Sequence, residues 1–156
     1  MYQRIVVPVD GSDTATAALV AALQLARDGG GRVLLLHVVE ELAFVDGYDM
    51  YGGNSGELLK VMREAGDKVL EAALAVAQSA GVQAETKLFD RLGERLGEVV
   101  ANAAREWKAD LIVLGTHGRR GIGRVLLGSG AEQIIRTAPT PVLVIRHTEK
   151  AAAPPG

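Results

Sequence analysis

The stretch "RIVVPVDGSDTA", Arg4 to Ala15, shows how this chain is built. Its first part, Arg4 to Val9, is β-branched and apolar at nearly every position, which is typical of a parallel strand covered on both faces. Pro8 cannot donate a ladder hydrogen bond, so we expect it at the carboxyl end of that strand. The following "DGSDTA" predicts a turn and a helix start, with Ser12 or Asp13 as the cap.

The same strand-turn-helix unit recurs along the chain. Apolar runs predict further strands at residues 32–39, 82–89, 110–115 and 141–146, and helical spacing predicts helices that begin near residue 13, at 57–80, 92–107 and 129–138. The run 82–89 alternates, which indicates an edge strand with one wetter face. Gly66 is expected to weaken the second helix midway. Residues 40–55 read as a long loop, with Asp46 and Asp49 solvated rather than bound to metal.

Strict alternation of strands and helices predicts an α/β fold: one five-stranded, mostly parallel sheet with helices on both faces. If the strand order is 3-2-1-4-5, the winding reverses between the first and fourth strands. Doubly wound sheets bind ligands outside the carboxyl ends of their strands at such a point. Asp10 follows the first strand and Gly115 ends the predicted fourth strand, so both would meet at one crevice.

Composition limits the function classes. The 156 residues predict a single domain, and the formal charge of −2 gives no reason to expect a nucleic acid or an anionic membrane as partner. Cysteine is absent, which excludes disulfides, thiolate metal sites and cysteine nucleophiles and fits a reducing compartment. We find no signal peptide and no apolar run long enough for a membrane span, so we expect the cytoplasm.

The segment "GTHGRRGIGRVLLGS", Gly115 to Ser129, combines five glycines and three arginines with no acidic residue. Glycine lets a backbone approach a ligand closely, and successive exposed N–H groups form an anion-binding concavity. Gly128 and Ser129 stand at the predicted start of a helix, where free N–H groups and the helix dipole favour phosphate. The segment therefore predicts a phosphate site, although a flexible connection would also be rich in glycine.

Single residues keep alternative interpretations. Asp10 is either a ligand contact or a turn residue, and Ser129 is either a helix cap or a phosphate contact. His37 reads as a satisfied strand residue, His117 as a pocket or a loop residue, and His147 as part of the tail; together they are too scattered to predict a metal site. No P-loop, complete dinucleotide fingerprint or nucleophile elbow is present in the sequence.

Four landmarks in order resemble the universal stress protein family: "IVVPVDGS", "LLHVV", "ADLIVLGTHGRRG" and "APTPVLVIR". The spacing Gly115-x-x-Gly118, nine residues, then Gly128-Ser129 is similar to the signature of its ATP-binding branch. The resemblance covers nearly the whole chain, with a domain at 1–147 and a flexible tail at 148–156. It implies a Rossmann-like fold of the adenine nucleotide alpha hydrolase type, strand order 3-2-1-4-5, a homodimer, and ATP (or ADP or AMP) with Mg²⁺.

The resemblance also implies a set of site residues. Asp10 would serve the ribose or the metal-phosphate region, Val38 the adenine wall, and the glycines with Ser129 the phosphates. The full set is Pro8, Val9, Asp10, Val38, Gly115, Thr116, His117, Gly118, Arg119, Gly128, Ser129 and Gly130. Gly130 is a departure, because many relatives have a β-branched residue there; it is expected to weaken the start of the last helix slightly.

We thus expect an ATP-binding, nucleotide-dependent stress-response regulator that acts as a homodimer through the last strand, Pro141 to Arg146. Pairing that apolar edge strand with its copy would cover it, although a helix or the tail could do the same. No catalytic residue is indicated; slow ATP hydrolysis or autophosphorylation is compatible with the site. The alternatives are a nucleotide-independent scaffold of the same fold and a slow ATPase or nucleotidyl-transfer enzyme.

Overall fold

The computed structural model describes residues 2–39, 55–90, 93–117 and 129–147. Strands and helices alternate along these ranges. The strands are β1 (Arg4–Pro8), β2 (Arg32–Val38), β3 (Gln83–Phe89), β4 (Leu111–His117) and β5 (Val142–His147). The helices are α1 (Asp13–Gly29), α3 (Ser55–Ser79), α4 (Leu96–Glu106) and α5 (Ser129–Thr137).

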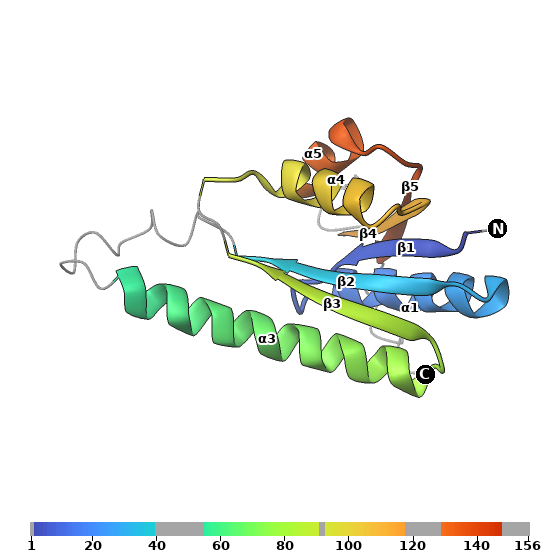
Figure 1. The fold of residues 1–156 in the computed structure, drawn as a ribbon, viewed down its shortest axis with the longest axis horizontal. Coiled ribbons are helices and arrows are strands. Elements are labelled where there is room, and N and C mark those ends of the chain that lie inside the picture. Colours follow the sequence, from blue (N-terminus) through green and yellow to red (C-terminus); the bar gives the residue numbers. More distant parts are fainter. Residues whose placement is uncertain (1, 40–54, 91–92, 118–128, 148–156) are drawn as a thin grey trace, which may run out of the picture.

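The strands form one five-stranded parallel sheet of order β3-β2-β1-β4-β5, which confirms the predicted fold class and strand order. Helices α4 and α5 cover one face and α1 and α3 the other (Figure 1). Alternate residues of each central strand serve the two faces: Val7 and Val113 pack toward α1 and α3, whereas Val6 and Ile112 pack toward α4 and α5. Because both faces are buried, the middle of each central strand is apolar at every position: residues 5–7, 33–36 and 111–114.

Local signals explain the first strand-helix unit. Pro8 is the last residue of β1, as expected. Ser12 is the N-cap of α1, and its Oγ accepts a hydrogen bond from the N–H of Ala15 at 3.2 Å. Gly30, with φ of 68°, ends α1 in the left-handed conformation that glycine adopts without steric cost.

Some predicted boundaries are wrong. Helix α4 begins at Leu96 rather than at residue 92, because Gly93, with φ of 91°, still belongs to a turn. Strand β4 continues past Gly115 to His117, because β5 pairs with it that far, Gly115 with Ile145 and His117 with His147. His147 therefore lies in β5 and not in the tail. The other predicted boundaries differ by at most two residues.

Helix α3 continues for 25 residues through Gly66, so the expected weak point does not interrupt it. A Cβ atom at Gly66 would lie 2.6 Å from Cδ2 of His37 and 2.8 Å from Cδ1 of Leu88. The glycine thus lets α3 pack directly on the side chains of β2 and β3.

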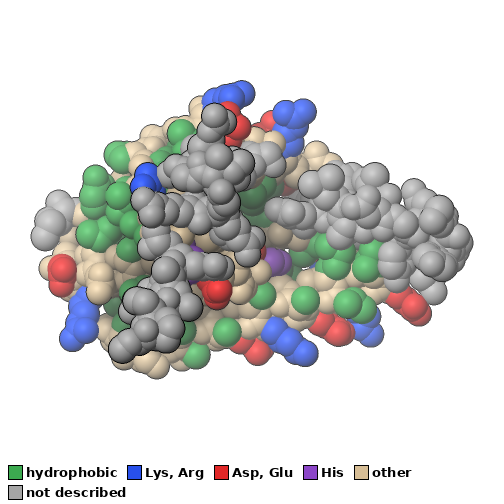
Figure 2. Space-filling model, turned by 180° about the vertical axis from the view of Figure 1, so that it is seen from behind, with side chains coloured by type: hydrophobic (Ala, Val, Ile, Leu, Met, Phe, Trp, Pro, Cys, Tyr) green, Lys and Arg blue, Asp and Glu red, His purple; other side chains and the backbone are tan. Residues whose placement is uncertain are grey.

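Seen from behind the view of Figure 1, the edge of the molecule along α3 carries interspersed charges of both signs (Figure 2). Residues 40–54 and 148–156, with Asp46, Asp49 and the predicted tail, lie outside the described residues.

Candidate functional site

The winding of the sheet reverses between β1 and β4, as expected. Strand β1 pairs with β2 on one side and with β4 on the other. The carboxyl ends of β1 and β4 therefore lie side by side, which is where ligands bind in open α/β sheets. Asp10 and Gly115, far apart in the sequence, are both found at this edge.

A cavity of about 120 Å³ opens at this edge. It is lined by the predicted site residues Pro8, Val9, Asp10, Val38 and Gly115. The remaining walls come from α1, α4 and α5 and from the neighbouring strands, and include Thr14, Leu36, His37, Leu96, Ala131 and Ile134. The cavity is mostly apolar, with polar side chains at Asp10, Thr14 and His37, as is usual for small-molecule sites.

Asp10 is a turn residue, one of the two roles that the sequence left open, and it also lines the cavity. Its Oδ1 accepts a hydrogen bond from the N–H of Ser12 at 2.9 Å, which is a turn contact. The side chain is exposed and also lines the cavity. Its second carboxylate oxygen has no partner among the described residues, so it is available to a hydroxyl group or a cation at the cavity mouth.

Glycine at position 115 is also needed for the packing of α1 against the sheet. A Cβ atom at this position would collide with the backbone carbonyl of Thr14 in the first turn of α1. Gly115 therefore allows α1 to lie close against β4, and a side chain here would push the helix away from the cavity. The sequence indicated close approach of a ligand at this glycine, and the structure adds close approach of a helix.

Gly130 also makes room for a neighbour. A Cβ atom there would lie 2.5 Å from Cδ2 of Leu96 on α4. Leu96 is itself a wall of the cavity, so a bulkier residue at 130 would displace that wall. This contact gives a packing reason for glycine near the start of α5, where helix propensity alone disfavours it.

The other predicted site residues are distributed as follows. Thr116 is buried in β4, and His117 ends that strand. Ser129 is the first residue of α5. Gly118, Arg119 and Gly128 lie outside the described residues. Among the described residues, no cluster of three or more His, Asp or Glu side chains could hold a metal ion, so no protein-built Mg²⁺ site is found there.

Several walls of the cavity were not predicted from the sequence. Leu36 could have been found, because it stands two residues before Val38 on the same face of β2. Leu96, Ala131 and Ile134 could not, because their places depend on how α4 and α5 cross the sheet. His37 was predicted as a satisfied strand residue. It does lie in β2, where its ring is hydrogen-bonded to the Val9 carbonyl oxygen, and it also lines the cavity.

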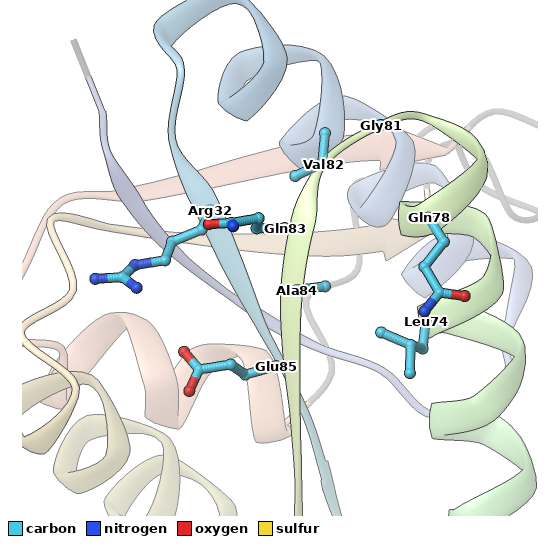
Figure 3. Close-up of a pocket in the computed structure, with 8 residues that line it drawn as sticks. All are labelled: Arg32, Leu74, Gln78, Gly81, Val82, Gln83, Ala84 and Glu85. Atoms are coloured by element: carbon cyan, nitrogen blue, oxygen red, sulfur yellow. The ribbon is translucent and has the colours of Figure 1, made fainter.

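A larger hollow, about 520 Å³, lies elsewhere and includes none of the predicted residues. It surrounds the amino end of the edge strand β3. Figure 3 shows Arg32 and Glu85 on one side of that strand and Leu74 and Gln78 on the other. The hollow thus follows the outer rim of the sheet, whereas the smaller cavity enters between strands and helices.

In the described ranges, every helix falls short of the length and apolarity needed to cross a bilayer.

Comparison with known proteins agrees with this arrangement. A universal stress protein of Methanocaldococcus jannaschii is 37% identical over 151 residues, which cover 96% of this chain and 85% of the relative. A crystal structure from the universal stress protein family of Burkholderia pseudomallei is 34% identical, with a TM-score of 0.72 and coverage of 92% and 96%. The universal stress protein of Archaeoglobus fulgidus in complex with dAMP is 25% identical, with a TM-score of 0.65 and coverage of 92% and 97%.

The family model described as the universal stress protein family matches residues 1–146. That range includes every described strand and helix, apart from the last residue of β5. The chain belongs to the universal stress protein family.

Proposed function

We propose that this protein binds an adenine nucleotide at the carboxyl ends of β1 and β4, with ATP and Mg²⁺ as the expected pair. The observation that carries the proposal is the cavity shared by Val9, Asp10, Val38 and Gly115 at the reversal of the winding. The dAMP complex of the similar Archaeoglobus fulgidus protein supports an adenine ligand.

The size of the cavity indicates which part of the nucleotide it would take. Sites for ligands of drug size usually measure about 300–1,000 Å³, and this cavity measures about 120 Å³. It therefore suits the base, with its apolar walls at Val9 and Val38. The ribose would lie near Asp10, and the phosphates near Gly118, Gly128 and Ser129, where backbone N–H groups and the amino end of α5 favour an anion.

Magnesium would then be held mainly by the phosphates. Mg²⁺ keeps several waters and is usually bound through one or two carboxylates and substrate phosphates. Asp10 is the candidate carboxylate, since one of its oxygens has no partner among the described residues.

Calorimetric titration with AMP and with ATP, with and without Mg²⁺, tests the proposal. We expect a dissociation constant in the micromolar range for at least one of these ligands. Gly118→Val should abolish that binding, because the added side chain would fill the phosphate space, while urea unfolding stays cooperative. Parent-like affinity in Gly118→Val would contradict the phosphate placement. Absence of binding in the parent would favour a nucleotide-independent scaffold, and rapid turnover would favour an enzyme.

The biological role that we propose is a nucleotide-dependent stress-response regulator in the cytoplasm that acts as a homodimer. A chain without cysteine suits a reducing compartment. Strand β5 is an edge strand, and Leu143 on it is 38% exposed, which supports pairing with a second copy. Nucleic acid and membranes are not expected partners, given the formal charge of −2.

A further inference from the structure

His37 links the candidate cavity to two elements at once. Its half-buried ring lines the cavity, and its Nδ1 lies 2.7 Å from the backbone carbonyl oxygen of Val9. A carbonyl oxygen only accepts hydrogen bonds, so Nδ1 must carry a proton and donate it. The geometry therefore fixes the tautomer or charge state to one with a protonated Nδ1.

This hydrogen bond lies where β1 and β2 separate. The register of the two strands ends at Pro8 opposite Leu36, and Val9 is the first residue beyond it. The N–H of Val9 still donates to the carbonyl of Leu36 at 2.8 Å, and the carbonyl of Val9 receives the imidazole N–H. Both polar backbone groups of Val9 are thus held by β2, one by the backbone and one by the His37 side chain.

The other side of the ring is held by α3. A Cβ atom at Gly66 would lie 2.6 Å from Cδ2 of His37 and 3.1 Å from its Nε2, so the ring and the helix backbone are in direct contact. Gly66 is the first buried position among residues 56–66 of α3. The helix therefore fixes the orientation of the ring, and a fixed ring holds its hydrogen bond in one direction.

We propose that His37 is a positioning residue for the nucleotide pocket. By holding the Val9 carbonyl, it sets the spacing between Val9, directly after β1, and Val38 on β2 at the cavity, and hence the width of the slot for the base. The inference rests on the proposed adenine-nucleotide function. His37 acts through Val9 and does not itself need to touch the ligand.

The test compares His37→Asn with His37→Leu. The two replacements have almost the same shape, but asparagine keeps an N–H donor at the position of Nδ1 and leucine has none. Removing the donor leaves a buried carbonyl without a partner, so we expect His37→Leu to weaken AMP binding about tenfold in calorimetry. His37→Asn should recover affinity to within about threefold of the parent. Urea unfolding of both variants checks that they fold.

A second measurement needs no substitution. NMR should show that the His37 ring is protonated at Nδ1 in the free protein. The resonance of this N–H proton should shift when AMP is added. Equal affinities for the leucine and asparagine variants, or a resonance unchanged at saturating AMP, would overturn the role of His37 while leaving nucleotide binding intact. If the parent binds no adenine nucleotide, the proposed function itself fails, and the inference fails with it.

Discussion

At the scale of single residues, glycines determine how closely helices approach this sheet. Gly115 admits the first turn of α1, and Gly66 admits the middle of α3. The sequence predicted Gly115 as part of an anion loop and Gly66 as a weak point in a helix. Neither packing partner could be foreseen, because Thr14 and His37 are distant from these glycines in the sequence and only the folded sheet brings them together.

Gly66→Ala should lower the stability of the protein, although alanine is the better helix former. The new methyl group would lie 2.6 Å from the His37 ring, and overpacking of this kind costs about 1–3 kcal/mol. Gly56→Ala, in the same helix with no atom within 4 Å of the added Cβ, is the matched control. It should leave the free energy of unfolding unchanged or slightly raised. If Gly66→Ala were as stable as Gly56→Ala in urea titrations, the packing of α3 on His37 would be wrong.

At the scale of elements, α4 and α5 meet at the edge of the cavity. The N–H of Gly97 donates to Oε1 of Gln133 at 3.3 Å, and the hydroxyl of Thr137 donates to the carbonyl of Gly97 at 3.1 Å. These bonds fix the crossing of the two helices. They also fix Leu96, whose side chain occupies the space that glycine leaves open at position 130.

Gly130→Val should therefore weaken nucleotide binding by moving Leu96 toward the cavity. We expect a loss of about tenfold in AMP affinity by calorimetry, corresponding to about 1.4 kcal/mol. Leu96→Ala in the same chain should recover part of the loss, because the two side chains compete for one space. Additive effects in this double-mutant cycle would show that Leu96 and Gly130 do not act through their contact.

Most elements were predictable from the sequence, because each central strand is a short apolar run and each helix has its own periodic face. Strand β1, the N-cap Ser12 and the edge position of β3 followed from local patterns. The start of α4 did not, since the apolar spacing continues through the turn at Gly93. The cavity walls that α4 and α5 contribute, Leu96, Ala131 and Ile134, depend on helix crossing, for which one sequence carries no direct signal.

At the scale of the whole molecule, β5 is the edge that we expect to form the homodimer. Ile145 packs against the core on the α1 side, so its replacement would disturb the fold as well as an interface. Leu143, 38% exposed, and the exposed Arg146 are better probes.

Leu143→Asp and Arg146→Glu should shift the protein from dimer to monomer in sedimentation velocity experiments. Each substitution acts twice across a two-fold interface, so even a modest repulsion is doubled. Val61→Asp on α3, where the side chain is 59% exposed, is the control and should remain dimeric. If the parent sediments as a monomer, or if both β5 variants remain dimers, then β5 does not form a dimer interface.

The central claim is that an adenine base enters the cavity between Val9 and Val38 at the carboxyl ends of β1 and β4. A crystal structure of the protein grown with AMP tests it most directly. We expect density for the base against Val9 and Val38, the ribose beside Asp10, and the phosphate toward the amino end of α5. Density in the hollow around the amino end of β3 instead, or an empty cavity at saturating AMP, would contradict the claim.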